Sequence, residues 1–262
     1  MYNFEFRTPK TLSEAIVLLR DEDALPLSGG QTLVPVLKQR LAAPSRLVSL
    51  CGIPDLKFVH VKDGVLCIGG ATTHAQVAKD ATAFPALAAL AGGIGDPAVR
   101  NRGTIGGSLG NNDPSACYPS AVLATGATIV TNTREIPADQ FFQGMFSTAL
   151  EEGEIVIEVR FPIPEKASYH KFCQPASRFA LTGVFVAKYA DHVGVAVTGA
   201  SSEGVFRWIE SEVALQKTFA TSAVAAVPQP DSELMIEDLH GTKAYRASLV
   251  KTVTQWAVND AV

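Results

Sequence analysis

Residues 92–119 read GGIGDPAVRNRGTIGGSLGNNDPSACYP, the stretch that differs most from an ordinary helix or strand. Its seven glycines and three prolines in 28 residues exclude a long helix and a regular strand. Four apolar residues, Ile94, Val99, Ile105 and Leu109, are spread through it and favour an ordered backbone over disorder. We therefore expect an ordered functional loop in this stretch.

A second glycine motif, SGGQTLVP at residues 28–35, lies upstream. It follows a short strand-like segment and opens a helical pattern, in which Pro35 is tolerated because it falls in the first turn. Gly29 and Gly30 let the backbone approach a ligand, and the next three amides lie at a helix N-terminus, where an anion is favoured. The Thr32 hydroxyl adds another donor. The alternative is a plain turn between a strand and a helix.

The segment TIGGSLGNNDP at residues 104–114 is expected to repeat this arrangement with Gly106, Gly107 and Gly110. Two such loops in one N-terminal domain favour a dinucleotide, because a dinucleotide has two ends to hold. Neither loop matches GxGxxG or GxxxxGK[ST], so a doubly wound NAD domain and a P-loop ATPase lose support.

Local signals outside the glycine motifs predict both helices and strands. Thr11 and Glu14 form a capping box in which Glu14 reaches back to the Thr11 amide, so a helix should begin there. Thr73 and Gln76 form a second one. Residues 63–64, Asp-Gly, predict a hairpin turn between two strand-like segments.

The pattern changes near residue 165, where Pro162 and Pro164 interrupt it and we place a domain boundary. The segments GVFVAKYA, VGVAVTGA and GVFRWIE that follow predict an antiparallel meander of three strands. Two helices, at roughly 210–220 and 241–258, are expected to cover one face of that sheet.

The composition of the 262 residues indicates a globular protein with a substantial apolar core. With 47% hydrophobic residues and no run of 18 apolar residues, we expect no membrane span, and without a secretory signal we expect a cytoplasmic location. A net charge of -4 without a basic cluster argues against nucleic acid as a partner. No CxxC pair joins Cys51, Cys67, Cys117 and Cys173, so we expect neither an iron–sulfur cluster nor a structural zinc.

Four motifs, taken in order, carry a resemblance to a known family: SGGQTLVPVLK, IGGATTHAQV, VRNRGTIGGSLGNNDPSACYPSAVLATGA and the late AYR at 244–246. Residues 2–258 resemble the FAD-binding medium subunits of the xanthine dehydrogenase and carbon monoxide dehydrogenase family. The resemblance implies a two-subdomain FAD-binding fold of the vanillyl-alcohol oxidase (PCMH) type, at about 1–55 and 56–165. A smaller α+β domain with a three-stranded antiparallel sheet and helices would follow at 166–262.

The resemblance also implies where the cofactor binds. The first loop would bind the FAD pyrophosphate through backbone amides, and the second would lie along the pyrophosphate and ribityl chain, near the flavin. Asn112 and Asp113 would contact polar groups of the cofactor, and Lys171 would place a positive charge near the flavin, a solvated lysine being the alternative. The implied set is Ser28, Gly29, Gly30, Gln31, Thr32, Leu33, Thr104, Ile105, Gly106, Gly107, Ser108, Asn112, Asp113 and Lys171.

This sequence departs from the family at two positions. Many relatives have an acidic residue where Cys117 stands, and many have Asp in the stretch that here reads RFALTG, with Leu181. Both departures affect the details of the flavin site and leave the resemblance intact.

The resemblance implies a role in electron transfer. In relatives, a large subunit with molybdopterin hydroxylates the substrate, and a small subunit carries two [2Fe–2S] clusters. This chain would accept their electrons onto FAD and pass them to an external acceptor, within a dimer of heterotrimers. It would perform no acid–base or nucleophilic step of its own, because the redox chemistry belongs to the cofactor.

Other conspicuous side chains have structural explanations. His74 is expected in the first turn of a helix as a structural or surface residue. Asp96 and Arg100 are either an ion pair that holds the second loop or two solvated charges. Trp208 and Trp256 are expected in the core, with a partner interface as the alternative.

Two rival functions stay open at this point. One is a self-contained flavoenzyme of the same fold, although the sequence offers no strong candidate for an acid–base residue. The other is a nucleotide-binding or assembly module without a redox role. The substrate of the complex and its electron acceptor are not readable from the sequence.

Overall fold

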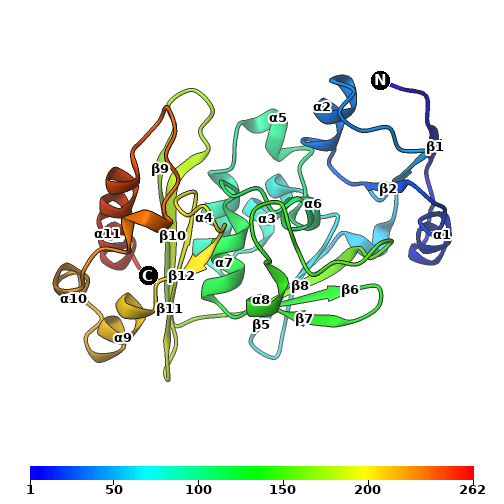
Figure 1. Cartoon of the computed structure of the whole chain (residues 1–262). Coiled ribbons are helices and arrows are strands. Elements are labelled where there is room, and N and C mark those ends of the chain that lie inside the picture. Colours follow the sequence, from blue (N-terminus) through cyan, green and yellow to red (C-terminus); the bar gives the residue numbers. More distant parts are fainter.

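The computed structural model describes all 262 residues as an α+β protein with three sheets. Figure 1 shows the N-terminal sheet at one end of the molecule, the C-terminal sheet at the other and the third sheet between them. The mixed helix and sheet architecture predicted from the sequence is confirmed. None of the helices combines the length and the apolar character that crossing a membrane requires.

The N-terminal sheet consists of three parallel strands in the order β1-β3-β2. The predicted capping box at its first helix forms only in part. The Thr11 hydroxyl accepts from the Glu14 amide at 3.2 Å, but the Glu14 carboxylate accepts from the amide of Lys10, not from that of Thr11. The elements are β1 (Glu5–Arg7), α1 (Leu12–Leu18), β2 (Ala24–Leu27), α2 (Leu33–Lys38), β3 (Arg46–Ser49) and the 3-10 helix η1 (Pro54–Leu56).

The middle sheet has five antiparallel strands in the order β4-β5-β8-β6-β7. The predicted hairpin turn is confirmed, since Asp63 and Gly64 both have positive φ, 51° and 76°, between β4 and β5. The strands are β4 (Val59–Lys62), β5 (Val65–Gly69), β6 (Thr128–Thr131), β7 (Glu135–Pro137) and β8 (Val156–Pro162).

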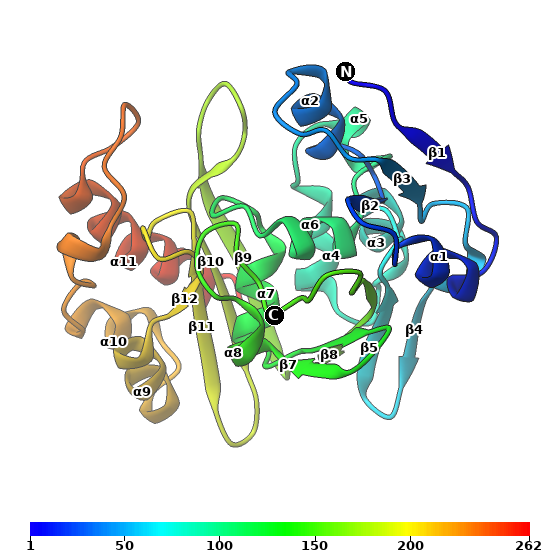
Figure 2. The same ribbon diagram turned by 45° about the vertical axis from the view of Figure 1, so that its right-hand side comes forward.

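The glycine-rich stretch is more helical than expected. We predicted a loop at 92–119, but the structure has short helices joined by tight turns, and none exceeds eight residues. In Figures 1 and 2, α6 lies between α2 and α7. The helices between β5 and β8 are α3 (His74–Asp80), α4 (Pro85–Gly92), α5 (Pro97–Arg100), α6 (Ile105–Asn111), α7 (Tyr118–Ala124) and α8 (Ala138–Phe141).

The C-terminal sheet has four antiparallel strands, in the order β12-β11-β10-β9, where three were predicted. The missed strand, β9 (Lys166–Cys173), lacks a clear alternation of buried and exposed residues, because only Ala167 and Ser168 are buried in it. The other strands are β10 (Ala180–Lys188), β11 (Val193–Thr198) and β12 (Phe206–Arg207).

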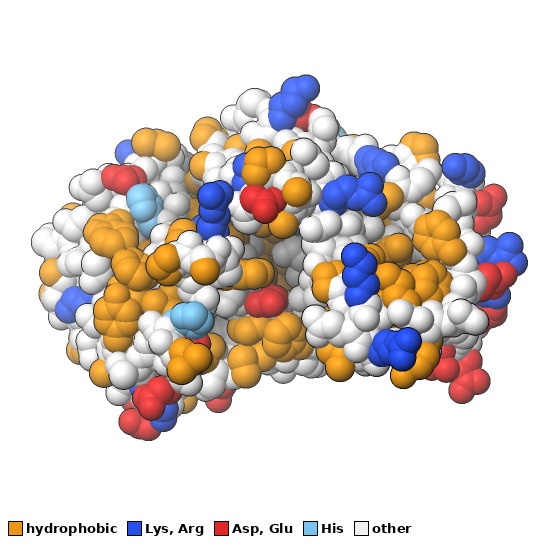
Figure 3. All heavy atoms as spheres, turned by 90° about the horizontal axis from the view of Figure 1, so that it is seen from above, with side chains coloured by type: hydrophobic (Ala, Val, Ile, Leu, Met, Phe, Trp, Pro, Cys, Tyr) orange, Lys and Arg blue, Asp and Glu red, His pale blue; other side chains and the backbone are white.

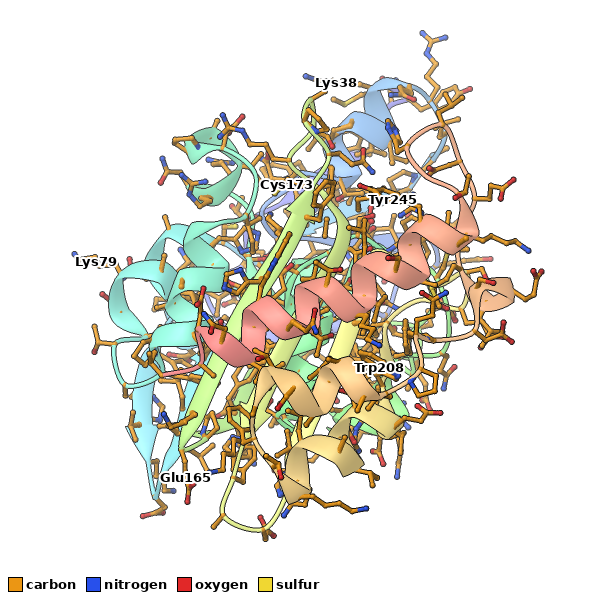
Figure 4. The ribbon with its side chains drawn as sticks, turned by 90° about the vertical axis from the view of Figure 1, so that its left-hand side faces the viewer. Lys38, Lys79, Glu165, Cys173, Trp208 and Tyr245 are labelled. Atoms are coloured by element: carbon orange, nitrogen blue, oxygen red, sulfur yellow. The ribbon has the colours of Figure 1, made fainter.

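Helices cover one face of this sheet, as predicted, but three α-helices follow β12 instead of two. Figure 4 shows α11 lying across the strands with the other two helices beside it. The opposite face packs against α4 and α7 of the preceding region. The helices are α9 (Ile209–Lys217), α10 (Thr221–Ala226), the 3-10 helix η2 (Ser232–Leu234) and α11 (Lys243–Asn259).

The largest hydrophobic cluster extends across the predicted domain boundary. It contains 28 buried residues, most of them from the middle region, and it includes Ala167, Phe185, Ala187 and Ala196 from the C-terminal sheet. Because the two regions share this core, the boundary near residue 165 stays a prediction.

Candidate functional site

The first glycine motif connects β2 to α2 and leaves a row of backbone donors unused. The amides of residues 29–33 donate no hydrogen bond to any group of the chain. Thr32 precedes the helix without a side-chain cap bond, so its hydroxyl is free as well. Gly30 has a φ of +72°, a conformation that other residues adopt with strain. Consecutive amides without partners at the start of a helix can bind an anion.

The second motif uses its amides internally and so differs from the expected repeat of the first. The Ile105 amide donates to the Thr72 carbonyl at 3.1 Å, and the Gly106 amide donates to the Gly70 carbonyl at 2.9 Å. The Gly107 amide donates to the Thr104 hydroxyl, which caps α6. Because these amides already have acceptors within the chain, the second motif offers a ligand its side chains and its closely packed backbone more than free amides.

The two motifs are in direct contact although they lie 76 residues apart. The Ser28 and Thr104 hydroxyls share a hydrogen bond of 2.7 Å. A Cβ atom on Gly29 would overlap the Arg102 carbonyl oxygen and lie 2.6 Å from the Gly103 Cα. Only glycine at position 29 permits this approach. The structure thus brings together the two motifs that the sequence singled out.

The residues that follow α6 hold the backbone in place. Asn112 is buried, and its side-chain amide donates to the carbonyls of Gly144 and Ser147, both at 2.8 Å. Asp113 accepts from the Ser115 amide at 2.8 Å. Both N–H groups of Asn112 are therefore used within the chain, while Asp113 is half-buried with one carboxylate oxygen free of such bonds.

Lys171 links three segments and is not a simple solvated lysine. Its ammonium group donates to the carbonyls of Gly93 at 2.8 Å and Arg178 at 3.1 Å, and lies 3.6 Å from the Cys117 sulfur. Burial raises the pKa of the Cys117 thiol, so the neutral thiol is favoured. Leu181, at the second departure, is buried.

Arg246, in the AYR motif, is a structural residue whose role the sequence did not reveal. It is 2% exposed, and its guanidinium donates to the carbonyls of Leu181 and Gly199, both at 2.7 Å, and to Asp238 at 2.6 Å. The Gly199 amide in turn donates to the Pro114 carbonyl. The helix α11 is thereby tied to the segment that follows the second glycine motif.

His74 is the first residue of α3, as predicted, and it is buried. Burial first, and then the charge of Arg100, lower the pKa of His74 to about 4.

Asp96 and Arg100 form no ion pair. The Asp96 carboxylate caps α5 by accepting from the Val99 amide, and Arg100 donates to the Ile94 and Gly95 carbonyls.

The remaining sequence candidates lie away from the glycine motifs. Trp208 is buried in the C-terminal core, as predicted, but Trp256 is 42% exposed, so the core reading is wrong for Trp256. All four cysteines are free, and no group of three or more His, Cys, Asp or Glu side chains is placed to hold a metal ion. Figure 3 looks down on the side that carries α2 and α5 and shows a hollow between the two ends of the molecule.

Comparisons with known proteins give a consistent result. Residues 2–164 match the family described as FAD binding domain in molybdopterin dehydrogenase. The carbon monoxide dehydrogenase medium chain of Hydrogenophaga pseudoflava is 31% identical, over 98% of this chain and 96% of its own length. The nicotine 6-hydroxylase medium subunit of Paenarthrobacter nicotinovorans is also 31% identical, with the same shares covered.

Solved structures agree with the sequence comparisons. A chain in the crystal structure of quinoline 2-oxidoreductase from Pseudomonas putida 86 superposes with a TM-score of 0.90 at 30% identity, covering 98% of this chain and 96% of that one. The match extends over both the glycine motifs and the C-terminal sheet. The chain therefore belongs to the family of FAD-binding medium subunits of molybdenum hydroxylases.

Proposed function

We propose that this chain binds FAD at its two glycine motifs and is the electron-transfer subunit of a heteromeric molybdenum hydroxylase. It accepts electrons from [2Fe–2S] clusters on a small partner subunit and passes them to an external acceptor. The observation that carries the proposal is the run of five consecutive amides, at residues 29–33, that have no acceptor within the chain.

The free donors of the first motif fit a diphosphate. Five backbone N–H groups and the Thr32 hydroxyl lie at the start of α2, where the helix dipole favours negative charge. Gly29 permits the Arg102 backbone to lie directly against this loop, so the backbone segments at residues 29 and 102 can both face one ligand. Bound FAD supplies the redox chemistry, because flavins exchange electrons singly or in pairs.

The chain's own residues bind and orient the cofactor. The hydrogen bond between Ser28 and Thr104 fixes the separation of the two motifs. Residues 104–108 would flank the diphosphate and ribityl chain, Asp113 would contact polar groups of the cofactor, and Lys171 would contribute a positive charge on the flavin side. His74 is buried, and with its lowered pKa it is neutral near pH 7, so it is not available as an exposed general base.

The partners are inferred from the relatives, which are named as medium chains or medium subunits. We infer a large molybdopterin subunit and a small iron–sulfur subunit, assembled with this chain as a dimer of heterotrimers in the cytoplasm. The large subunit selects the substrate of the complex.

FAD titration of the purified full chain tests the cofactor assignment. The wild-type chain is expected to become yellow and to bind FAD, whereas Gly29→Ala is expected to lower the affinity at least about tenfold, since the methyl group overlaps the Arg102 carbonyl. Gly92→Ala is the matched control, because the nearest atom to its added Cβ is 3.8 Å away. A wild-type chain that stays colourless after incubation with FAD would favour the non-redox module.

Purification of the native complex through a tag on this chain tests the electron-transfer assignment. We expect molybdenum and iron to co-purify with FAD in fixed ratio, and the flavin absorbance to bleach only in the complex when a hydroxylase substrate is added. Steady turnover of an organic electron donor by the isolated chain would instead favour the self-contained flavoenzyme.

A further inference from the structure

His74 contacts Gly103, and Gly103 in turn contacts Gly29 of the first motif. A Cβ atom on Gly103 would lie 2.6 Å from the His74 Nε2 atom, so the imidazole touches the backbone at residue 103. A Cβ atom on Gly29 would lie 2.6 Å from the Gly103 Cα, so the first motif packs against the same residue. The histidine ring therefore supports the first motif through one intervening glycine.

Backbone hydrogen bonds hold these residues in register. The His74 amide donates to the Gly103 carbonyl at 2.9 Å, and Thr73 and Thr104 are joined as an antiparallel bridge. The imidazole also packs against the Tyr118 ring, with 5.4 Å between ring centroids. A ring packed against both Tyr118 and Gly103 fixes the position of the backbone that it touches.

The histidine is not explained by polar contacts of its own. It is 4% exposed, and its Nδ1 atom has no hydrogen-bond partner. A buried polar atom without a partner costs free energy. The ring therefore gains no stability from a hydrogen bond at this atom, and its packing against Gly103 and Tyr118 is what can give it a role.

We propose that His74 is a positioning residue for the cofactor. Its imidazole fixes the position of the Gly103 backbone, and through Gly103 the position of the amides at residues 29–33 that hold the FAD diphosphate. This inference rests on the proposed function. If it holds, FAD affinity depends in part on His74, a residue outside both glycine motifs.

Two substitutions of His74 separate size from chemistry. His74→Ala removes the support beneath Gly103 and is expected to weaken FAD binding by the full chain about tenfold. His74→Gln keeps an amide group near the position of the Nε2 atom and is expected to stay within about threefold of wild type. Quenching of flavin fluorescence measures both affinities. Equal affinities for wild type and His74→Ala would overturn the proposal.

A compensating pair tests the contact itself. Gly103→Ala places a methyl group against the imidazole and is expected to weaken FAD binding about tenfold or more, because the backbone at residue 103 must move. Combining it with His74→Ala removes the two closest contacts of the methyl group, and the next, with the Val99 carbonyl oxygen, is 3.1 Å away. The double variant is expected to bind FAD more tightly than Gly103→Ala alone, whereas additive losses would contradict the support through Gly103.

Val77→Ala controls for a general weakening of α3. Val77 is fully buried on the same helix but is not one of the nearest contacts of Gly103. It is expected to lower the melting temperature at least as much as His74→Ala while leaving FAD affinity within about twofold. Parallel losses of stability and affinity in both variants would reduce His74 to an ordinary core residue. A wild-type chain that fails to bind FAD would instead refute the proposed function.

Discussion

The protonation of His74 makes folding stability depend on pH. Its pKa is lowered from 6.5 to about 4 in the folded chain, so the unfolded chain binds the proton more tightly. The contribution of neutral His74 to the free energy of unfolding is therefore complete above pH 6.5. It is lost as the pH falls toward 4, by about 3 kcal/mol in all. Urea unfolding between pH 7 and 4.5 measures this slope. His74→Gln is expected to show a shallower slope than wild type, and an unchanged slope would contradict the assignment.

Glu154 is a second residue whose charge state supports the fold. Burial raises its pKa, but hydrogen bonds from Arg134, Thr131 and the Glu151 amide outweigh burial and hold the pKa at about 2. Because this value lies below 4.5, the stabilisation is complete above pH 4.5 and is lost as the pH falls toward 2. Glu154→Gln is expected to lower the free energy of unfolding by about 2–3 kcal/mol at pH 7.

The neighbouring Glu151 provides the control for this prediction. Its carboxylate is 3.3 Å from Arg134, but its side chain is 78% exposed. An exposed ion pair contributes little, so Glu151→Gln is expected to change the free energy of unfolding by less than about 1 kcal/mol. Similar losses in the two variants would mean that the buried network at Glu154 has no special weight.

At the scale of single residues, the sequence predicted which motifs matter better than how they act. The free amides at residues 29–33 follow from a glycine pair before a helix, a local pattern. The roles of Asn112, His74 and Arg246 depend on partners far away in the chain, such as the Gly144 carbonyl. No local rule identifies such partners from one sequence.

Among the elements, α6 shows why glycine is needed within a helix. Gly106 lies against the backbone of Gly70, and an added Cβ would be 2.6 Å from the Gly70 carbonyl oxygen. Gly106→Ala is expected to destabilise the protein by about 2 kcal/mol and to displace the second motif from the β5 end. Thermal unfolding and FAD affinity measure the two effects.

Gly110 in the same helix is the matched opposite case. Its added Cβ would meet only the Leu150 side chain at 3.6 Å, an ordinary contact. Because alanine favours the helix over glycine, Gly110→Ala is expected to stabilise the protein by up to about 1 kcal/mol. If both alanine variants behave alike, helix propensity and not the close approach to Gly70 decides the glycine content of α6.

Elements with strong local signals were predicted well, and the others were not. The Asp63–Gly64 hairpin is local and is confirmed. Of the second predicted capping box, the Thr73 cap of α3 is confirmed, but the Gln76 side chain donates to Asp80 and not back to Thr73. The helices within 92–119 were missed because glycine content opposes a helix, whereas here close backbone packing requires glycine. Strand β9 was missed because its neighbours, β10 on one side and α11 above it, determine its burial.

In the whole molecule, the shared core predicts cooperative unfolding. Phe84 of the middle region packs edge-on against Phe185 of the C-terminal sheet, with ring centroids 6.0 Å apart, and against Phe161. Residues 1–165 alone would expose this cluster to water, so we expect that fragment not to fold by itself. Calorimetry of the full chain is expected to show a single transition. Two separate transitions, or a folded fragment, would support independent domains.

The buried guanidinium of Arg246 has a consequence for the order of events during synthesis. Chains fold broadly from the N-terminus as they leave the ribosome, and both glycine motifs emerge long before α11. Until Arg246 arrives, the Leu181 and Gly199 carbonyls lack their guanidinium donor, and the segment beyond α6 is held to β11 through Thr198 and Gly199 without the support of α11. We therefore expect nascent polypeptides that lack the last helix to capture no coenzyme, so that loading is a late step in maturation.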